Sequence, residues 1–191
     1  MSYRVKVGVS NKHLHLSEED FKTLFGNDRK LTSIKELVQP GQFACDERVE
    51  LIGGKGSFKN IRIIGPLRPQ TQVELSLTDT RTIGIKPEIR ESGDLKGTPG
   101  IKIIGPVGEI DLKEGVIVAK RHVHLNPEQS EESGFNNGEI VKVKIANGDR
   151  KLIFDDVVVR TGEKHEGEFH LDTDEANASG VSSGDEIEVY A

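Results

Sequence analysis

The chain has 191 residues, of which 34% are hydrophobic and 30% are charged, and its formal net charge is -6. The excess of acids disfavours nucleic acid as a partner, because neutralising phosphates needs a basic surface, and no apolar run reaches the roughly 20 residues of a membrane-spanning helix. A single cysteine excludes an intrachain disulfide and every metal site built from several thiolates, so any metal must be held by histidine and carboxylate.

Short runs in which apolar and polar residues alternate recur along the chain and predict half-buried strands. They lie at residues 4–9, 47–52, 60–64, 72–77, 115–119, 139–145, 151–154, 157–160 and 186–190. Ser17 with three acids after it predicts the start of a helix, and Asn126 with Pro127 predicts a second. A tight hairpin turn is predicted at Asn147. The pattern is typical of a mostly β protein with a few short helices.

An internal repeat divides the chain. Residues 5–18 resemble residues 115–128, and each segment is a predicted strand that ends in His-x-His before a helix cap. Farther along, residues 47–76 match residues 140–172 more loosely, and this alignment places Glu74 at the position that corresponds to His170. We predict two similar β-barrel domains, residues 1–95 and 96–191, which are divided by the segment 92–100 with its Gly and Pro residues.

The two His-x-His motifs predict metal sites. Residues two apart in a strand point to the same side, so His13 and His15 can chelate one ion, and His122 and His124 another. A single motif of this kind is weak evidence, but two copies at matching places in a repeat are much stronger.

Glu74 and His170 bring the candidate ligands to six, which is enough for two open sites or a bridged pair. Imidazole and carboxylate without sulfur favour zinc. The ordinary alternatives are a cross-strand partner for Glu74 and a capping or core histidine at position 170. We expect His165 to be solvated and Cys45 to be a buried, inert thiol.

Arg68 and Ser10 are the predicted catalytic residues. Arg68 lies in a rigid turn one strand before Glu74, where a guanidinium can bind phosphate or carboxylate with two hydrogen bonds. The alternative is an exposed loop arginine. Ser10 stands three residues before His13, where it can donate to a metal-bound oxyanion or simply end the strand.

Five segments carry a resemblance to a known family: residues 10–17, 65–76, 92–100, 114–125 and 170–178. Together they resemble the phosphate propanoyltransferase family, the PduL-type phosphotransacylases, over nearly the whole chain. The resemblance implies two β-barrel domains capped by short helices, with two metal ions, usually zinc, between them. It also allows the first strand, at about residues 3–10, to pack with the C-terminal domain.

The reaction implied is acyl-CoA plus phosphate giving acyl phosphate plus coenzyme A, by direct attack of phosphate on the thioester. Arg68 is then the phosphate-binding residue, with Ser10 nearby. The metal ligands carried over by position are His13, His15, Glu74, His122, His124 and His170. The acyl chain, acetyl or propanoyl, and a homo-oligomeric state are left open.

Relatives housed in bacterial microcompartments carry an amphipathic segment before the first strand, which here begins at about Tyr3. We therefore expect a free cytoplasmic enzyme rather than an encapsulated one. One alternative is a cupin-like metal protein, although residues 17–25 predict a capped helix where a cupin needs a strand. The others are a dinuclear metallohydrolase and a scaffold protein with surface histidines.

Overall fold

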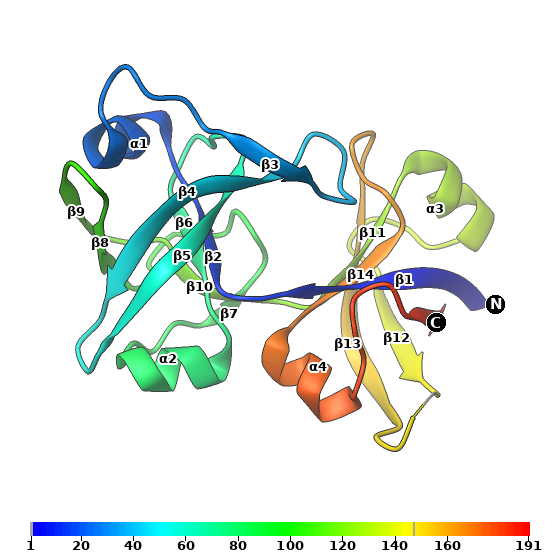
Figure 1. The fold of residues 1–191 in the computed structure, drawn as a ribbon. Helices are drawn as coiled ribbons and strands as arrows, with labels where there is room; N and C mark the ends of the chain where they lie inside the picture. The colour runs from blue at the N-terminus through cyan, green and yellow to red at the C-terminus, as the bar shows by residue number, and fades with distance from the viewer. Residues whose placement is uncertain (1, 147) are drawn as a thin grey trace. The chain divides into compact units, whose positions relative to one another are not determined.

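The computed structural model describes residues 2–146 and 148–191 and divides into two compact units (Figure 1). One, here called the barrel unit, holds the described residues up to 11 together with 38–40 and 120–191. The other, the sheet unit, holds residues 12–37 and 41–119. The division falls after residue 119, whereas the repeat predicts it after residue 95. Strands between these positions pair with strands of the sheet unit.

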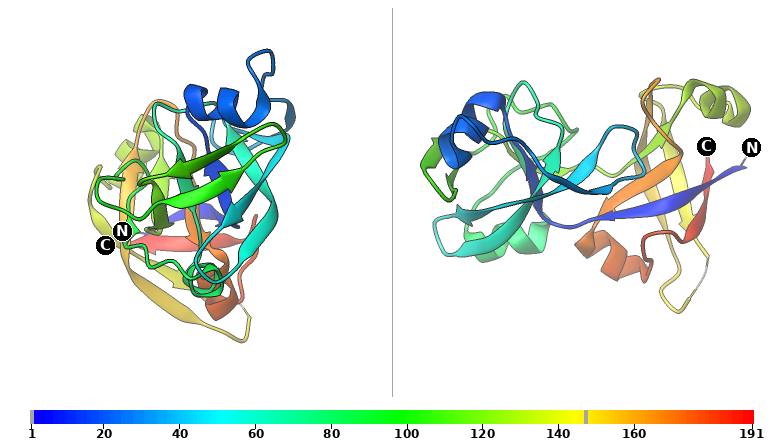
Figure 2. Two further views of the ribbon diagram at one scale, coloured as in Figure 1. Left: turned by 90° about the vertical axis from the view of Figure 1, so that its left-hand side faces the viewer. Right: turned by 45° about the horizontal axis from the view of Figure 1, so that its top comes forward.

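The barrel unit is built on a closed barrel, in the order β1-β14-β11-β13-β12-β15 among the described residues. Its strands are β1 (Ser2–Ser10), β11 (His122–Leu125), β12 (Ile140–Ile145), β13 (Leu152–Thr161), β14 (Glu168–Asp172) and β15 (Glu186–Tyr190). β1 pairs in parallel with β14 and antiparallel with β15, so the first strand closes a barrel made otherwise of C-terminal strands. Figure 2 shows β1, in blue, beside β14, in orange, in its right-hand view.

Alternation along these strands fills the barrel with apolar side chains. Val7, Val123, Phe169 and Val189 are all buried in one continuous core. Successive side chains of a strand point to opposite faces, so the residues next to these four point away from the core. The histidines next to Val123 and Phe169 are therefore directed to the other face.

The sheet unit is built on one curled sheet, in which the described strands follow the order β7-β10-β6-β2-β5-β4-β8-β9, and β3 pairs with β4. They are β2 (His13–His15), β3 (Ser33–Glu36), β4 (Phe43–Ile52), β5 (Ser57–Gly65), β6 (Gln72–Glu74), β7 (Ile89–Arg90), β8 (Ile101–Ile104), β9 (Glu109–Leu112) and β10 (Val116–Ala119). The core of this unit includes Leu14, Leu51, Ile63 and Val73. The predicted mostly β class is confirmed, with a closed barrel in one unit and a curled half-barrel in the other.

Four short helices lie between the described strands: α1 (Glu18–Phe25), α2 (Leu77–Ile83), α3 (Pro127–Ser133) and α4 (Thr173–Ser179). Each begins at a capping side chain that accepts a hydrogen bond from a backbone N–H of the first turn. The helix starts predicted at Ser17 and Asn126 are confirmed. α2 was not predicted, because the alternating run 72–77 extends across its cap, Ser76.

The predicted hairpin turn includes Asn147, which lies outside the described residues. The strands on either side, β12 and β13, pair antiparallel from Ile145 and Leu152 onwards. None of the helices among the described residues is long and apolar enough to cross a membrane.

Substitution of Phe169 tests how far the stability of the barrel unit depends on its core. Replacing it with alanine removes a fully buried ring beside Phe154 and leaves a cavity, so we expect the free energy of unfolding to fall by about 3–5 kcal/mol. Chemical denaturation measures the loss. The control is Ile153→Ala, at an exposed position of β13, which we expect to cost about 1 kcal/mol or less. Equal losses in the two variants would contradict the assigned core.

Candidate functional site

The first cluster lies in the sheet unit, where β2 pairs antiparallel with β6. This register sets His13 opposite Glu74 and His15 opposite Gln72. Residues that lie directly opposite on neighbouring strands share a face of the sheet. His13 Nε2 consequently lies 3.6 Å from Glu74 Oε2, and His15 Nε2 lies 3.9 Å from Glu74 Oε1.

The protonation of His15 follows from its surroundings. Its Nδ1 donates to the carbonyl oxygen of Ile64 at 2.9 Å. Burial, and then the neighbouring charges of His13 and Arg68, hold the pKa of His15 well below 6.5, so the ring is neutral. A neutral ring that donates from Nδ1 has an unprotonated Nε2. Two acceptors, this nitrogen and the Glu74 carboxylate, thus face each other, an arrangement that a cation would satisfy.

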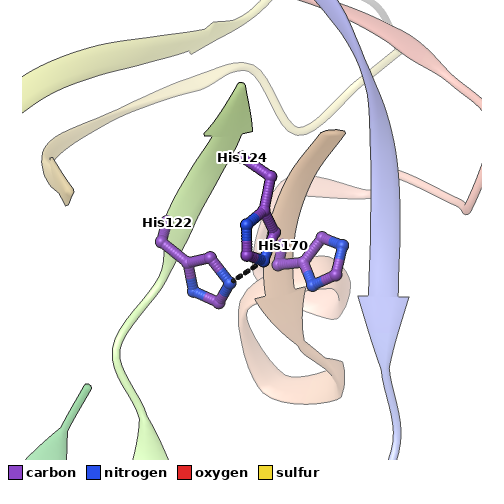
Figure 3. Close-up of side chains that lie close together, drawn as sticks. All are labelled: His122, His124 and His170. Atoms are coloured by element: carbon purple, nitrogen blue, oxygen red, sulfur yellow. Dashed lines mark hydrogen bonds between the residues drawn. The ribbon is translucent and has the colours of Figure 1, made fainter. Parts of the chain in front are cut away.

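The second cluster lies in the barrel unit and repeats this plan. β11 pairs antiparallel with β14, which sets His122 opposite His170 and His124 opposite Glu168. Figure 3 shows the three histidine rings side by side, with a hydrogen bond between His122 Nε2 and His124 Nε2 at 3.0 Å. His122 Nδ1 donates to the carbonyl oxygen of Lys120 at 2.8 Å, so its Nε2 presents a lone pair to the cluster.

His124 is the most constrained ring of the second cluster. Burial, followed by the charges of His122 and His170, strongly lowers the pKa of His124, so this ring is also neutral. Its Nδ1 is buried and has no hydrogen-bond partner among the described residues. His165 was expected to be solvated, but its part-buried ring packs against His124 with 4.2 Å between ring centroids. That expectation is wrong because the loop after β13 folds back over the cluster.

Both clusters fit the donor set of a zinc site. Each offers three nitrogen or carboxylate oxygen atoms that lie within 4.8 Å of one another. Ligand atoms about 2.0–2.1 Å from a tetrahedral zinc are separated by roughly 3.3 Å, close to the shorter distances above. Two of the histidines hold a backbone carbonyl through their second nitrogen, as metal-bound histidines usually do.

Arg68 lies beside the first cluster. Its backbone N–H donates to the carbonyl oxygen of Leu16 at 2.9 Å, which ties the loop to the end of β2. Its guanidinium donates to Ser92 Oγ at 3.1 Å, and the same oxygen accepts a hydrogen bond from Gln72 Nε2 at 2.8 Å. The side chain is therefore fixed within a polar network that includes a neighbour of Glu74, rather than extended into solvent as a loop arginine.

Ser10 belongs to the other unit. It ends β1 and pairs with Asp172, two residues after the pair that Gly8 forms with His170. The structure thus places Ser10 on the strand next to the second cluster and Arg68 next to the first. Sequence reasoning missed Gln72 and Glu168, which lie opposite the second histidine of each motif. The internal repeat carries a signal for both residues, because each stands two residues before the third member of its cluster.

Cys45 is fully buried in the core of the sheet unit. Burial, followed by the charge of Glu47, raises the pKa of the Cys45 thiol to about 11. A thiol in this setting is protonated at neutral pH and is a poor nucleophile. The expectation of an inert thiol agrees with this environment.

The family model of phosphate propanoyltransferase matches residues 6–182. The chain belongs to the phosphate propanoyltransferase family. It is 54% identical over 179 residues to the phosphate propanoyltransferase of Thermotoga maritima, with 94% of this chain and 85% of that protein covered. It is 54% identical to that of Sebaldella termitidis over 186 residues, with 96% of this chain and 87% of that protein covered.

The predicted family is thus confirmed, and the chain is an acyltransferase enzyme. The cupin-like alternative is wrong, because helix α1 occupies the segment that a cupin motif requires as strand. Family membership likewise leaves no support for a metallohydrolase or a scaffold of surface histidines. Both relatives bear the name of an acyltransferase, phosphate propanoyltransferase.

The reactivity of Cys45 tests its assignment as an inert thiol of the core. A pH of 8 is about three units below the pKa of this thiol, so only about one molecule in a thousand carries a thiolate. We expect a disulfide reagent such as Ellman's reagent to leave the native thiol unmodified and to titrate one thiol per chain after denaturation. Rapid reaction of the native protein, or loss of transfer activity in Cys45→Ala, would contradict this assignment.

Proposed function

We propose that this chain transfers the acyl group of a short-chain acyl-CoA to phosphate, with one zinc ion held by each cluster. The family membership supports the reaction class. One observation supports a metal-dependent reaction. Two separate antiparallel strand pairs each bring three donor atoms together, and the cross-strand pairing is equivalent in the two pairs.

The proposed reaction balances without a covalent enzyme intermediate. An oxygen of phosphate forms a bond to the thioester carbonyl carbon, the carbon–sulfur bond breaks, and coenzyme A leaves as a thiolate. Metal ions bound at the clusters would supply Lewis-acid stabilisation of the developing oxyanion and of the thiolate. Cys45, buried and protonated, has no part in this scheme.

Arg68 is assigned the binding and orientation of phosphate. A planar guanidinium matches two phosphate oxygens, and its contact with Ser92 limits the rotamers that it can adopt. Holding phosphate in a fixed orientation makes its attack effectively unimolecular. Ser10 is assigned a hydrogen bond from its hydroxyl to an oxygen of the reacting group.

Propanoyl-CoA and acetyl-CoA are both proposed as substrates. They differ by one methylene, which a pocket can distinguish by only about 1–3 kcal/mol. We further propose that the enzyme works in the cytoplasm, where acyl-CoA and phosphate are both available. Its excess of acids argues against nucleic acid as a partner.

Substitution of Arg68 tests the phosphate assignment. With acyl-CoA and phosphate as substrates and thiol release as the readout, we expect Arg68→Ala to lower kcat/KM at least about tenfold, a loss of 1.4 kcal/mol. We expect Arg68→Lys to keep part of the activity and to raise KM for phosphate more than KM for acyl-CoA, because it keeps the charge without the paired hydrogen bonds. Arg81→Ala, an exposed arginine of α2, is the control. Unchanged kinetics in Arg68→Ala would reject the assignment.

Metal removal and His124 test the metal assignment. We expect a chelator to abolish thiol release and added Zn2+ to restore it, and His124→Ala to lower the rate at least about tenfold while reducing bound zinc from about two ions per chain to about one. Elemental analysis measures the metal. Full activity in metal-free protein, or wild-type rates in His124→Ala, would refute the metal-dependent reaction.

A further inference from the structure

Two buried residues that are not ligands occupy equivalent places in the repeat. Gln72 lies opposite His15, and Glu168 lies opposite His124. Each stands two residues before the third ligand of its cluster, on the same strand and the same face. Their exposed fractions are 1% and 7%. A buried polar side chain must find hydrogen-bond partners, and these two find them in the clusters.

Gln72 holds Glu74. Its Nε2 donates to Glu74 Oε1 at 2.6 Å, and its Oε1 accepts from the backbone N–H of Gly93 at 2.8 Å. A carboxylate only accepts and a backbone N–H only donates, so these partners fix the orientation of the amide without ambiguity. The third contact, from Nε2 to Ser92 Oγ, joins this support to the contact of Arg68.

Glu168 holds His170. Its Oε2 lies 2.5 Å from His170 Nε2 and also accepts from Gln39 Nε2 at 3.1 Å. Gln39 is in turn fixed by the backbone of Glu166, since it donates to the carbonyl oxygen and accepts from the N–H. Space for Glu168 exists because residue 8 is glycine: a Cβ there would lie 2.6 Å from the Glu168 carboxyl carbon.

Gln72 and Glu168 have opposite hydrogen-bonding roles, because the residues that they contact differ. Gln72 offers an N–H to a carboxylate, and Glu168 offers a carboxylate to an imidazole. His170 donates from Nε2, which leaves the lone pair of Nδ1 for a metal. His122 donates from Nδ1, which leaves the lone pair of Nε2. In Figure 3 one ring nitrogen of His170 faces the other two histidines and the second points away.

We propose that Gln72 and Glu168 are matched positioning residues, each of which orients the third metal ligand of its own cluster and no other. The proposal rests on the metal sites of the proposed function. Partners that orient a ligand in this way are typically worth a 10- to 100-fold change in metal affinity. Their effect should be local, because each contacts a single cluster.

Zinc titration of the full chain tests the proposal. The protein is stripped with a chelator and titrated with Zn2+ against a chromophoric competitor, and Glu74→Ala and His124→Ala identify which binding step belongs to which cluster. We expect Gln72→Leu to weaken the first cluster about 10- to 100-fold and leave the second unchanged, and Glu168→Leu to do the reverse. We expect a smaller loss in Glu168→Gln, because its amide oxygen still accepts from His170.

Matched controls separate positioning from general damage. Gln70→Leu and Glu186→Leu make the same changes at exposed positions and should leave both affinities unchanged. The visible absorption spectrum of the Co2+-loaded variants should change at the affected cluster only. Wild-type affinity in Gln72→Leu and Glu168→Leu, or weakening of both clusters by either variant, would overturn the proposal while leaving the proposed function intact. Wild-type protein that binds no zinc would instead overturn the metal sites and this proposal together.

Discussion

The cross-strand register of each His-x-His strand is the constraint on which the rest of the site depends. His13 and His15 lie on either side of Leu14, and His122 and His124 lie on either side of Val123; both central residues are completely buried in the cores of their units. A slip of one residue would exchange the faces, so that two histidines would enter the core and an apolar side chain would leave it. The hydrophobic cores therefore hold the clusters in place.

The two clusters share a backbone plan but differ in charge. Glu74 gives the first cluster a carboxylate, whereas the second consists of three imidazoles, and burial keeps His15 and His124 neutral. A dication bound in the first cluster would keep about one net positive charge and in the second about two. Neighbouring charges offset this difference, because Glu168 places a carboxylate 2.5 Å from His170 Nε2 and the Arg68 guanidinium lies beside the first cluster. Divergence at a single repeat position, Glu74 against His170, is sufficient to produce this difference.

The sequence predicted which side chains gather in the two clusters, because period-two alternation and an internal repeat are local signals that can be recognised without a structure. It did not predict their supports. Gln72 looks like any polar residue of an alternating strand, and Gln39 is 127 residues away from the Glu166 backbone that it contacts. The helix α2 was hidden by the alternating run before it, although Ser76 and Asp79 form a capping box. The contacts of Gln39 are long-range pairings, which no short window of sequence contains, whereas the capping box of α2 is a local signal.

The pairing of β1 has a consequence for the order in which the chain acquires its structure. β1 (Ser2–Ser10) leaves the ribosome long before its partners β14 and β15, which end at Asp172 and Tyr190. The barrel cannot close until β14 and β15 have been synthesised, and until then the edges of β1 have no strand partners from this barrel. During that interval the residues of β1 must be kept from pairing with other strands, and the second cluster can assemble only after β14 has been synthesised.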